Sequence, residues 1–244
     1  MANTHFQFKQ FIVHQDKSAM KVTTDSCLFG AWAGERVRSQ ESRVGRVVDI
    51  GAGTGLLSLM FAQKHPEVII DAIEIDNESF RQASENIAVS PWADRIKPVH
   101  ADAREYHFLH KYDIIISNPP FYDRELKGDD TRKNIARHDE GLLLPELLKI
   151  IKSKLEPEGS FYLLLPYKRN EETKQLLTEH ELDVQQITLV RQTTKHDYFR
   201  IMLSGTLKTK ELTETIIDEI AIKDQTDKYT AAFTHLLKDY YLHL

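Results

Sequence analysis

Short apolar runs alternate with stretches of helical periodicity along most of the chain. In the stretches expected to be helices, apolar residues recur every three or four positions, whereas the expected strands are short, nearly unbroken apolar runs. The expected strands are residues 47–50, 68–75, 96–99, 112–117, 161–165, 184–190 and 199–203. The helices expected between them are residues 56–64, 77–90, 142–155 and 171–178. This alternation predicts a doubly wound α/β sheet, and the unbroken runs fit parallel strands covered on both faces.

Aromatic and apolar residues also mark the two flanks of this core. Phe6, Phe8 and Phe11 precede a helix that we expect to begin at Asp25, and they are expected to cover one edge of the core. Apolar residues at helical spacing predict a second flanking helix over residues 226–241. We expect one domain over residues 1–244, made of an N-terminal extension (1–45), a catalytic core (46–205) and a C-terminal segment (206–244).

Composition and charge narrow the class of protein. The chain has 244 residues, a net charge of −5 and one cysteine, Cys27. A single cysteine excludes an internal disulfide framework, and the histidines show no metal-ligand spacing, so we expect no metal. No long apolar stretch and no signal-like start are present, so we expect a cytoplasmic protein with no membrane partner. A nucleic-acid partner would have to meet a local basic patch.

The first chemical signal is a glycine-rich turn that follows the first expected strand. Asp49 precedes Gly51, Gly53 and Gly55. Glycines allow positive φ and let the backbone approach a ligand closely. Dinucleotide sites use G-x-G-x-x-G beside a pyrophosphate, which Asp49 would repel, whereas it would attract an ammonium or sulfonium. The turn favours a cationic nucleotide that carries an amino acid over NAD; a turn that needs glycine for shape alone is the alternative.

Two carboxylates follow the next two expected strands. Glu74 lies 19 residues after Gly55, where it can accept hydrogen bonds from both hydroxyls of a ribose. Asp76 is expected to cap the helix that follows. Asp102 can accept a hydrogen bond from an adenine amino group, or serve as an ordinary turn aspartate.

The sharpest signal is Asn118-Pro119-Pro120-Phe121, at the end of the fourth expected strand. The two prolines restrict the backbone and make the turn rigid. Ligands of open α/β sheets bind at the carboxyl ends of the strands, so the turn projects an amide and an aromatic ring into that crevice. An Asn-Pro turn that merely ends a strand is the alternative. Together with the glycine turn and Glu74, the motif indicates a functional site.

These motifs resemble those of class I S-adenosylmethionine-dependent methyltransferases. The motif at residues 118–121 resembles the [DN]-P-P-[YFW] signature of enzymes that methylate planar nitrogens. The segments that resemble the bacterial tRNA1(Val) (adenine(37)-N6)-methyltransferase family are residues 6–11, 19–25, 28–32, 136–138 and 236–242. Phe121 stands where many members carry tyrosine, which keeps the ring and loses a hydroxyl. The resemblance implies a Rossmann-like, seven-stranded sheet whose last strand is antiparallel.

The resemblance also implies a cofactor, a reaction and roles for individual residues. S-adenosyl-L-methionine is the expected cofactor, with its methionine end at the glycine turn, its ribose at Glu74 and its adenine at Asp102. The residues expected to bind it are Asp49, Gly51, Gly53, Gly55, Glu74, Asp102, Ala103, Thr24 and Asp25. The expected reaction is direct methyl transfer to N6 of a flipped-out adenine, adenine 37 in the anticodon loop. The residues expected to act in it are Asn118, Pro119, Pro120 and Phe121.

Basic residues near and after this motif are the expected contacts to tRNA. Residues 122–140 form a long polar, charged stretch. Its last three cations, Arg132, Lys133 and Arg137, have no acidic residue between them, so they can bind phosphates. A solvated loop is the alternative. The expected partner is the anticodon stem-loop of tRNA, bound by a monomer. The expected contact residues are Lys21, Arg124, Lys127, Arg132, Lys133, Arg137 and His138.

Two other functions remain open on the sequence. A protein glutamine N5-methyltransferase shares the Asn-Pro-Pro turn, but it usually has a larger N-terminal helical domain than residues 1–45 provide. A non-catalytic RNA-binding module on the same scaffold is the second, and the intact Asn118 and Phe121 argue against it.

Overall fold

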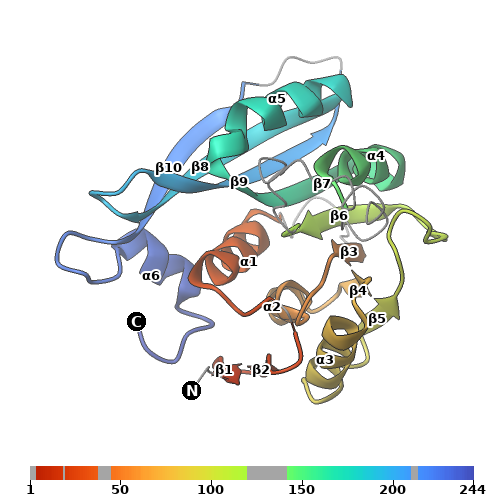
Figure 1. Ribbon diagram of the computed structural model, residues 1–244, viewed down its shortest axis with the longest axis horizontal. Helices are drawn as coiled ribbons and strands as arrows, with labels where there is room; N and C mark the ends of the chain where they lie inside the picture. Colours follow the sequence, from red (N-terminus) through yellow and green to blue (C-terminus); the bar gives the residue numbers. More distant parts are fainter. Residues whose placement is uncertain (1–3, 19, 38–44, 120–141, 210–213) are drawn as a thin grey trace, which may run out of the picture.

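The structure is a computed structural model that describes residues 4–18, 20–37, 45–119, 142–209 and 214–244. Its main sheet contains the strands β3 (Arg46–Ile50), β4 (Ile69–Glu74), β5 (Ile96–His100), β6 (Tyr112–Ser117), β7 (Leu155–Pro166), β8 (Leu182–Thr193), β9 (Tyr198–Leu207) and β10 (Ile216–Lys223). Their order across the sheet is β10-β8-β9-β7-β6-β3-β4-β5 (Figure 1). Strand β3 pairs in parallel with β4 and β6, and the order reverses there. A doubly wound sheet binds ligands at such a reversal.

The number of strands differs from the expectation. The seven predicted strands are all present, and β9 runs antiparallel to both β7 and β8, as expected. The main sheet has an eighth strand, β10, which pairs in parallel with β8 at the edge. The first four residues of β10 are all exposed, so its sequence lacks the unbroken apolar run that marks a central strand.

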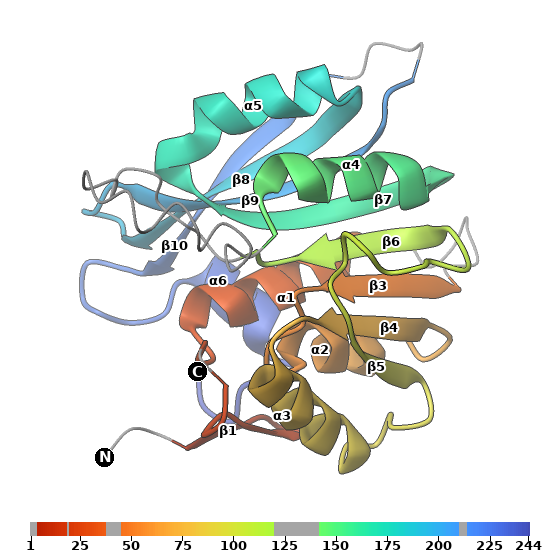
Figure 2. The ribbon, with the colours of Figure 1, turned by 45° about the vertical axis from the view of Figure 1, so that its right-hand side comes forward.

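Helices cover both faces of the sheet. They are α1 (Thr24–Arg36), α2 (Leu56–Lys64), α3 (Asn77–Ala88), α4 (Leu144–Lys154), α5 (Asn170–Glu179) and α6 (Ala231–Leu237), with a short 3-10 turn at Tyr167–Arg169. Successive residues of a strand point to opposite faces. Accordingly Ile114 and Ile116 pack in the core beneath α1, α2, α3 and α6, and Ile115 packs in the core beneath α4 and α5 (Figure 2).

The N-terminal residues form a separate two-stranded hairpin, β1 (His5–Gln7) and β2 (Ile12–His14). As expected, its phenylalanines pack on the core, with Phe8 and Phe11 buried and Phe6 half-buried. Phe8 stacks on Phe11 with ring centroids 4.4 Å apart, and Phe11 meets Trp92 edge-on. Phe8 also forms an isolated antiparallel bridge with Tyr241, close to the other end of the chain. The hairpin therefore joins the two flanks of the core.

The C-terminal helix is shorter than the prediction. The spacing predicts a helix over residues 226–241, but α6 begins after Thr230, whose hydroxyl accepts a hydrogen bond from the Phe233 N–H. Before it, the Asp224 carboxylate accepts bonds from the backbone N–H groups of a turn, and Asp227 has a left-handed φ of 65°. That turn prevents the helix from beginning earlier.

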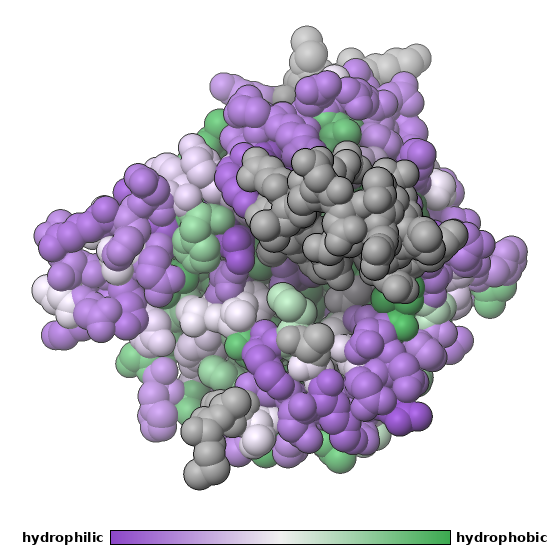
Figure 3. Space-filling model, viewed as in Figure 1, coloured by the Kyte–Doolittle hydropathy of each residue, from purple (hydrophilic) through white to green (hydrophobic). Residues whose placement is uncertain are grey.

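The face of the molecule in Figure 3 is mainly polar where its residues are described. In the view of Figure 3, hydrophilic side chains dominate and apolar ones lie in small separate areas. None of the helices in the described part of the chain is long and apolar enough to cross a membrane.

Candidate active site

A cavity of about 240 Å³ lies at the carboxyl ends of β3, β4 and β6. Its walls come from the glycine turn, the end of β4, the turn after β5, the end of β6, and the segment that leads into α1. The sequence-predicted residues that line it are Lys21, Gly51, Gly53, Glu74, Asp102, Ala103, Asn118 and Pro119. The fold thus brings together at one edge groups that are up to 98 positions apart in the sequence, Lys21 and Pro119.

The glycine turn connects β3 to α2 through left-handed backbone. The φ angles of Gly51, Gly53 and Gly55 are 76°, 58° and 81°, which only glycine adopts readily. A Cβ atom built on Gly51 or Gly53 would meet no atom within 4 Å, so the space before them is open. Gly55 instead packs beside Ala83 of α3 and does not line the cavity. Gly55 lies at the start of α2.

Asp49 lies behind the turn rather than in the cavity wall. Its side chain is fully buried, and Oδ2 accepts hydrogen bonds from the backbone N–H and the hydroxyl of Ser58, at 3.1 and 2.7 Å. Oδ1 has no hydrogen-bond partner. Burial raises the pKa of Asp49 to about 7, because a carboxylate is poorly solvated there. Its predicted role towards the methionine end stays a prediction.

Glu74 is held in place by backbone donors. Its Oε2 accepts from the Gly53 N–H and its Oε1 from the Asp76 N–H, both at 2.8 Å. A carboxylate has about four acceptor positions, so these two bonds fix the group and leave others for a ligand. Asp76 caps α3, as predicted, by accepting from the Ser79 N–H at 2.8 Å, and this bond lowers the pKa of Asp76.

Asp102 forms an ion pair that the sequence analysis does not predict. The Arg104 guanidinium binds the carboxylate of Asp102 in a bidentate fashion, at 3.0 Å from Nε to Oδ1 and 2.6 Å from Nη2 to Oδ2. This ion pair lowers the pKa of Asp102 and fixes its orientation beside the cavity. Arg104 also lies 3.7 Å from Glu146 of α4. The sequence feature that could have indicated this ion pair is an arginine two positions after a turn aspartate.

The Asn-Pro turn lies where the sequence predicts it. Asn118 and Pro119 directly follow β6 and line the cavity. The Ser117 hydroxyl donates to the Ile50 carbonyl at 2.6 Å, which fastens the end of β6 to the end of β3 beside the glycine turn. The predicted site residues that lie outside the described residues are Pro120, Phe121, Arg124, Lys127, Arg132, Lys133, Arg137 and His138.

The segment leading into α1 contributes different residues from those predicted. Thr24 and Asp25 do not line the cavity, and the Asp25 carboxylate accepts a hydrogen bond from Arg200 at 2.8 Å. The residues of this segment that do line it are Met20, Lys21, Val22, Thr23 and Ser26. Thr23 and Ser26 form a reciprocal capping box at the start of α1. A threonine followed three positions later by a serine was the signal for that cap.

The cavity suits a cationic molecule that carries hydroxyl and amino groups. Among the described residues, Glu74, Asp76 and Asp102 line it, against one lysine, Lys21, whose ammonium group donates to the Gln15 carbonyl. The described residues contain no group of three or more histidine, cysteine, aspartate or glutamate side chains that could hold a metal ion.

Comparison with known proteins places this chain in a family. A family model described as methyltransferase small domain matches residues 36–202. A tRNA1(Val) (adenine(37)-N6)-methyltransferase of Parabacteroides distasonis is 38% identical over 244 residues, which cover 99% of each chain. A protein of that name from Dyadobacter fermentans is 50% identical over 164 residues, 67% of this chain and 66% of the relative.

The fold has solved counterparts. The crystal structure of a predicted O-methyltransferase from Agrobacterium tumefaciens superimposes with a TM-score of 0.68, at 14% identity, over 88% of this chain and 95% of that one. At so low an identity, the likeness shows the class I methyltransferase fold and nothing finer.

Proposed function

The chain belongs to the tRNA1(Val) (adenine(37)-N6)-methyltransferase family, and on that premise we propose that it methylates N6 of adenine 37 in the anticodon loop of tRNA1(Val), with S-adenosyl-L-methionine as the methyl donor. One observation carries the proposal. A single cavity joins a glycine turn, a ribose-type carboxylate at Glu74 and the Asn118-Pro119 turn at the carboxyl edge of the sheet.

The residues present fit the proposed cofactor. The open space before Gly51 and Gly53 is a cradle that side chains at these positions would fill. The free acceptor positions of Glu74 suit ribose hydroxyls, and Asp102, fixed by Arg104, suits an adenine amino group. The unpartnered Oδ1 of Asp49 lies behind the turn and favours positive charge nearby. When bound, S-adenosylmethionine supplies an electrophilic methyl group.

Asn118 and Pro119 would activate the acceptor by orientation. The exocyclic amine of adenine is a weak nucleophile because its lone pair is delocalised into the ring. The side-chain oxygen of Asn118 and the backbone carbonyl of Pro119 can accept its two N–H groups. Both residues line the cavity. Holding the amine this way would localise the lone pair and aim it at the methyl group, so most of the rate enhancement comes from positioning. Phe121 would stack on the extruded base.

The tRNA would be held by positive charge around the cavity. Lys21 is the proposed contact that lies among the described residues, and it lines the cavity. The remaining proposed contacts are Arg124, Lys127, Arg132, Lys133, Arg137 and His138. Because tRNA is the substrate, we expect the protein to work in the cytoplasm.

Asn118→Ala tests the mechanism. Loss of one amine acceptor should lower the rate of methyl transfer by at least about 1,000-fold, because the lone pair is no longer aimed, while cofactor affinity stays within about twofold. The measurement is N6-methyladenosine in digested tRNA1(Val) transcript, by mass spectrometry, with S-adenosylhomocysteine binding by calorimetry.

Asn170→Ala is the matched control, because α5 contributes no residue to the cavity and this variant should keep full activity. Full activity in Asn118→Ala would refute the mechanism. If the wild-type protein binds cofactor but produces no methylated adenine, the acceptor must be sought among protein glutamines or other RNAs.

A further inference from the structure

Helix α3 buries three polar side chains on one face. Ser79, Gln82 and Asn86 are spaced by three and four positions, which places them in one row. They are only 5%, 1% and 1% exposed. Buried polar groups need hydrogen-bond partners, and apolar residues would be the ordinary choice for a helix face packed on a core. The row therefore has a partner that is itself polar.

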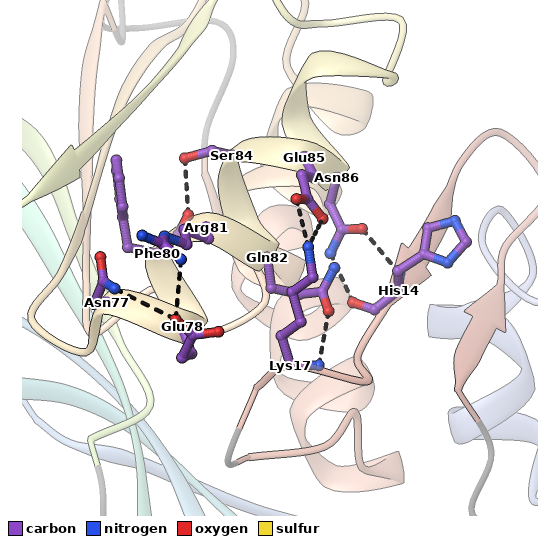
Figure 4. A network of polar contacts seen from close by, with 10 residues as sticks. All are labelled: His14, Lys17, Asn77, Glu78, Phe80, Arg81, Gln82, Ser84, Glu85 and Asn86. Carbon is purple, nitrogen blue, oxygen red and sulfur yellow. Dashed lines mark hydrogen bonds and ion pairs between the residues drawn. The ribbon is translucent and has the colours of Figure 1, made fainter.

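That partner is the segment over residues 14–18, which follows the N-terminal hairpin (Figure 4). The Asn86 amide binds the backbone of His14 twice: Oδ1 accepts from the N–H and Nδ2 donates to the carbonyl, both at 2.9 Å. Gln82 Oε1 accepts from the Lys17 N–H at 3.1 Å, and the Ser18 and Ser79 hydroxyls lie 3.3 Å apart. The Lys17 ammonium also donates to the Glu85 carboxylate, so the segment is fixed along the helix through both its backbone and its side chains.

Asn86 also holds the glycine turn. Its Nδ2 makes a second donation, to the Thr54 carbonyl, at 2.9 Å. Thr54 lies next to Gly53 and lines the cavity. Both hydrogens of the amide are therefore used, one on the turn and one on His14.

Hydrogen bonds also tie the segment held by α3 to residues that line another part of the cavity wall. Gln15 Oε1 accepts from the Val22 N–H at 2.7 Å, and the Lys21 ammonium donates to the Gln15 carbonyl. These bonds fold residues 20–22 back over the part of the segment that Asn86 and Gln82 fix. Met20, Lys21 and Val22 all line the cavity.

We infer that Asn86 is a positioning residue of the cofactor site, which sets the glycine turn and the residues 14–18 and 20–23 at the spacing that the cofactor needs. The inference rests on the proposed function, because it takes this cavity as the cofactor site. Asn86 touches no reacting atom, so its effect should fall on cofactor binding and leave the chemical step unchanged.

Asn86→Asp tests the inference at nearly constant volume. One carboxylate oxygen can still accept from the His14 N–H, but the other would face two carbonyl oxygens in place of donating to them. The dissociation constant of S-adenosylhomocysteine and the KM for S-adenosylmethionine should each rise about 10- to 100-fold. We expect kcat at saturating cofactor to stay within about twofold, and a general loss of folding would not separate kcat from cofactor binding in this way.

Two further variants complete the test. Gln82→Met removes only the acceptor for the Lys17 N–H and should weaken cofactor binding by about 3- to 10-fold. Ser84→Ala is the matched control: its hydroxyl bonds within α3, to the Phe80 carbonyl, and its affinity should equal that of the wild type. Wild-type affinity in Asn86→Asp, or in Gln82→Met if the first variant does not fold, overturns the inference.

Cofactor binding is measured here without tRNA, which keeps the two proposals separable. A wild-type protein that binds S-adenosylhomocysteine but methylates no tRNA would overturn the proposed function alone.

Discussion

The carboxyl group of Asp49 lies where its ionised form is poorly solvated. The group is fully buried, one of its oxygens has no partner, and burial raises its pKa to about 7. An ionised group in that place lowers the stability of the folded protein. A cationic cofactor would favour the same ionised form. Under the proposed function, this residue would trade stability for cofactor binding, as groups at functional sites often do.

The loss of stability caused by burying the ionised Asp49 carboxylate should be measurable as a pH dependence of the free energy of unfolding. The folded-state pKa, about 7, is above the ordinary value of 3.8, so the protonated group favours folding below about pH 4, and this contribution is lost as pH rises through 7. Asn mimics the protonated acid. Asp49→Asn should match the wild type near pH 4 and exceed it by about 2–4 kcal/mol at pH 8 in urea unfolding without cofactor. An equal difference at both pH values would contradict this assignment.

The sequence predicts those helices and strands whose own apolar residues account for their burial. The run at Ile114, Ile115 and Ile116 needs no knowledge of its neighbours, and α2 begins and ends where its apolar spacing does. Strand β10 and the β1–β2 hairpin are not predictable in this way, because pairing with distant β8 and packing against distant Tyr241 stabilise them.

The residues of the candidate site fall into the same two groups: those predictable from their own stretch of sequence, and those that depend on distant contacts. The glycine turn, Glu74 and Asn118 are visible because each follows its own strand. The contribution of Thr23 and Ser26, in place of Thr24 and Asp25, depends on how the N-terminal segment lies across α3.

Phe8→Ala tests how much the hairpin depends on its aromatic contacts. The ring is 1% exposed and packs between Phe11 and Tyr241, so its loss should lower the free energy of unfolding by about 3–5 kcal/mol. Ile12→Ala, in the same hairpin but 37% exposed, should lower it by less than about 1 kcal/mol. Urea unfolding of both variants gives the comparison, and equal losses would show that the ring is not held by this packing.

At the scale of the whole molecule, charge is the property that an RNA partner must overcome. The net charge is −5, and most of the visible surface of the described residues is hydrophilic (Figure 3). A net negative charge gives no general attraction to tRNA, so we expect binding to come from a limited basic area.

The affinity for tRNA should accordingly fall steeply with salt. If about four phosphates are neutralised, raising the salt concentration from about 50 to about 200 mM should weaken binding roughly 100-fold, because each contact releases counterions. Fluorescence anisotropy with labelled tRNA measures this directly. An affinity that does not change with salt would exclude phosphate contacts as the main source of binding.

The contact between the two ends of the chain has a consequence for synthesis on the ribosome. The Lys9 ammonium donates to the Lys238 carbonyl, 229 positions later, and Phe8 pairs with Tyr241. At about 5–20 residues per second, the hairpin waits roughly 10 to 50 seconds for these partners to be translated. During that interval Phe6 and Phe8 lack the Tyr241 ring and are open to chaperones. Residues of one cavity wall come soon after this hairpin in the sequence. A nascent chain that already contains the glycine turn and Asn118 therefore still lacks the C-terminal contacts that hold the hairpin before that wall.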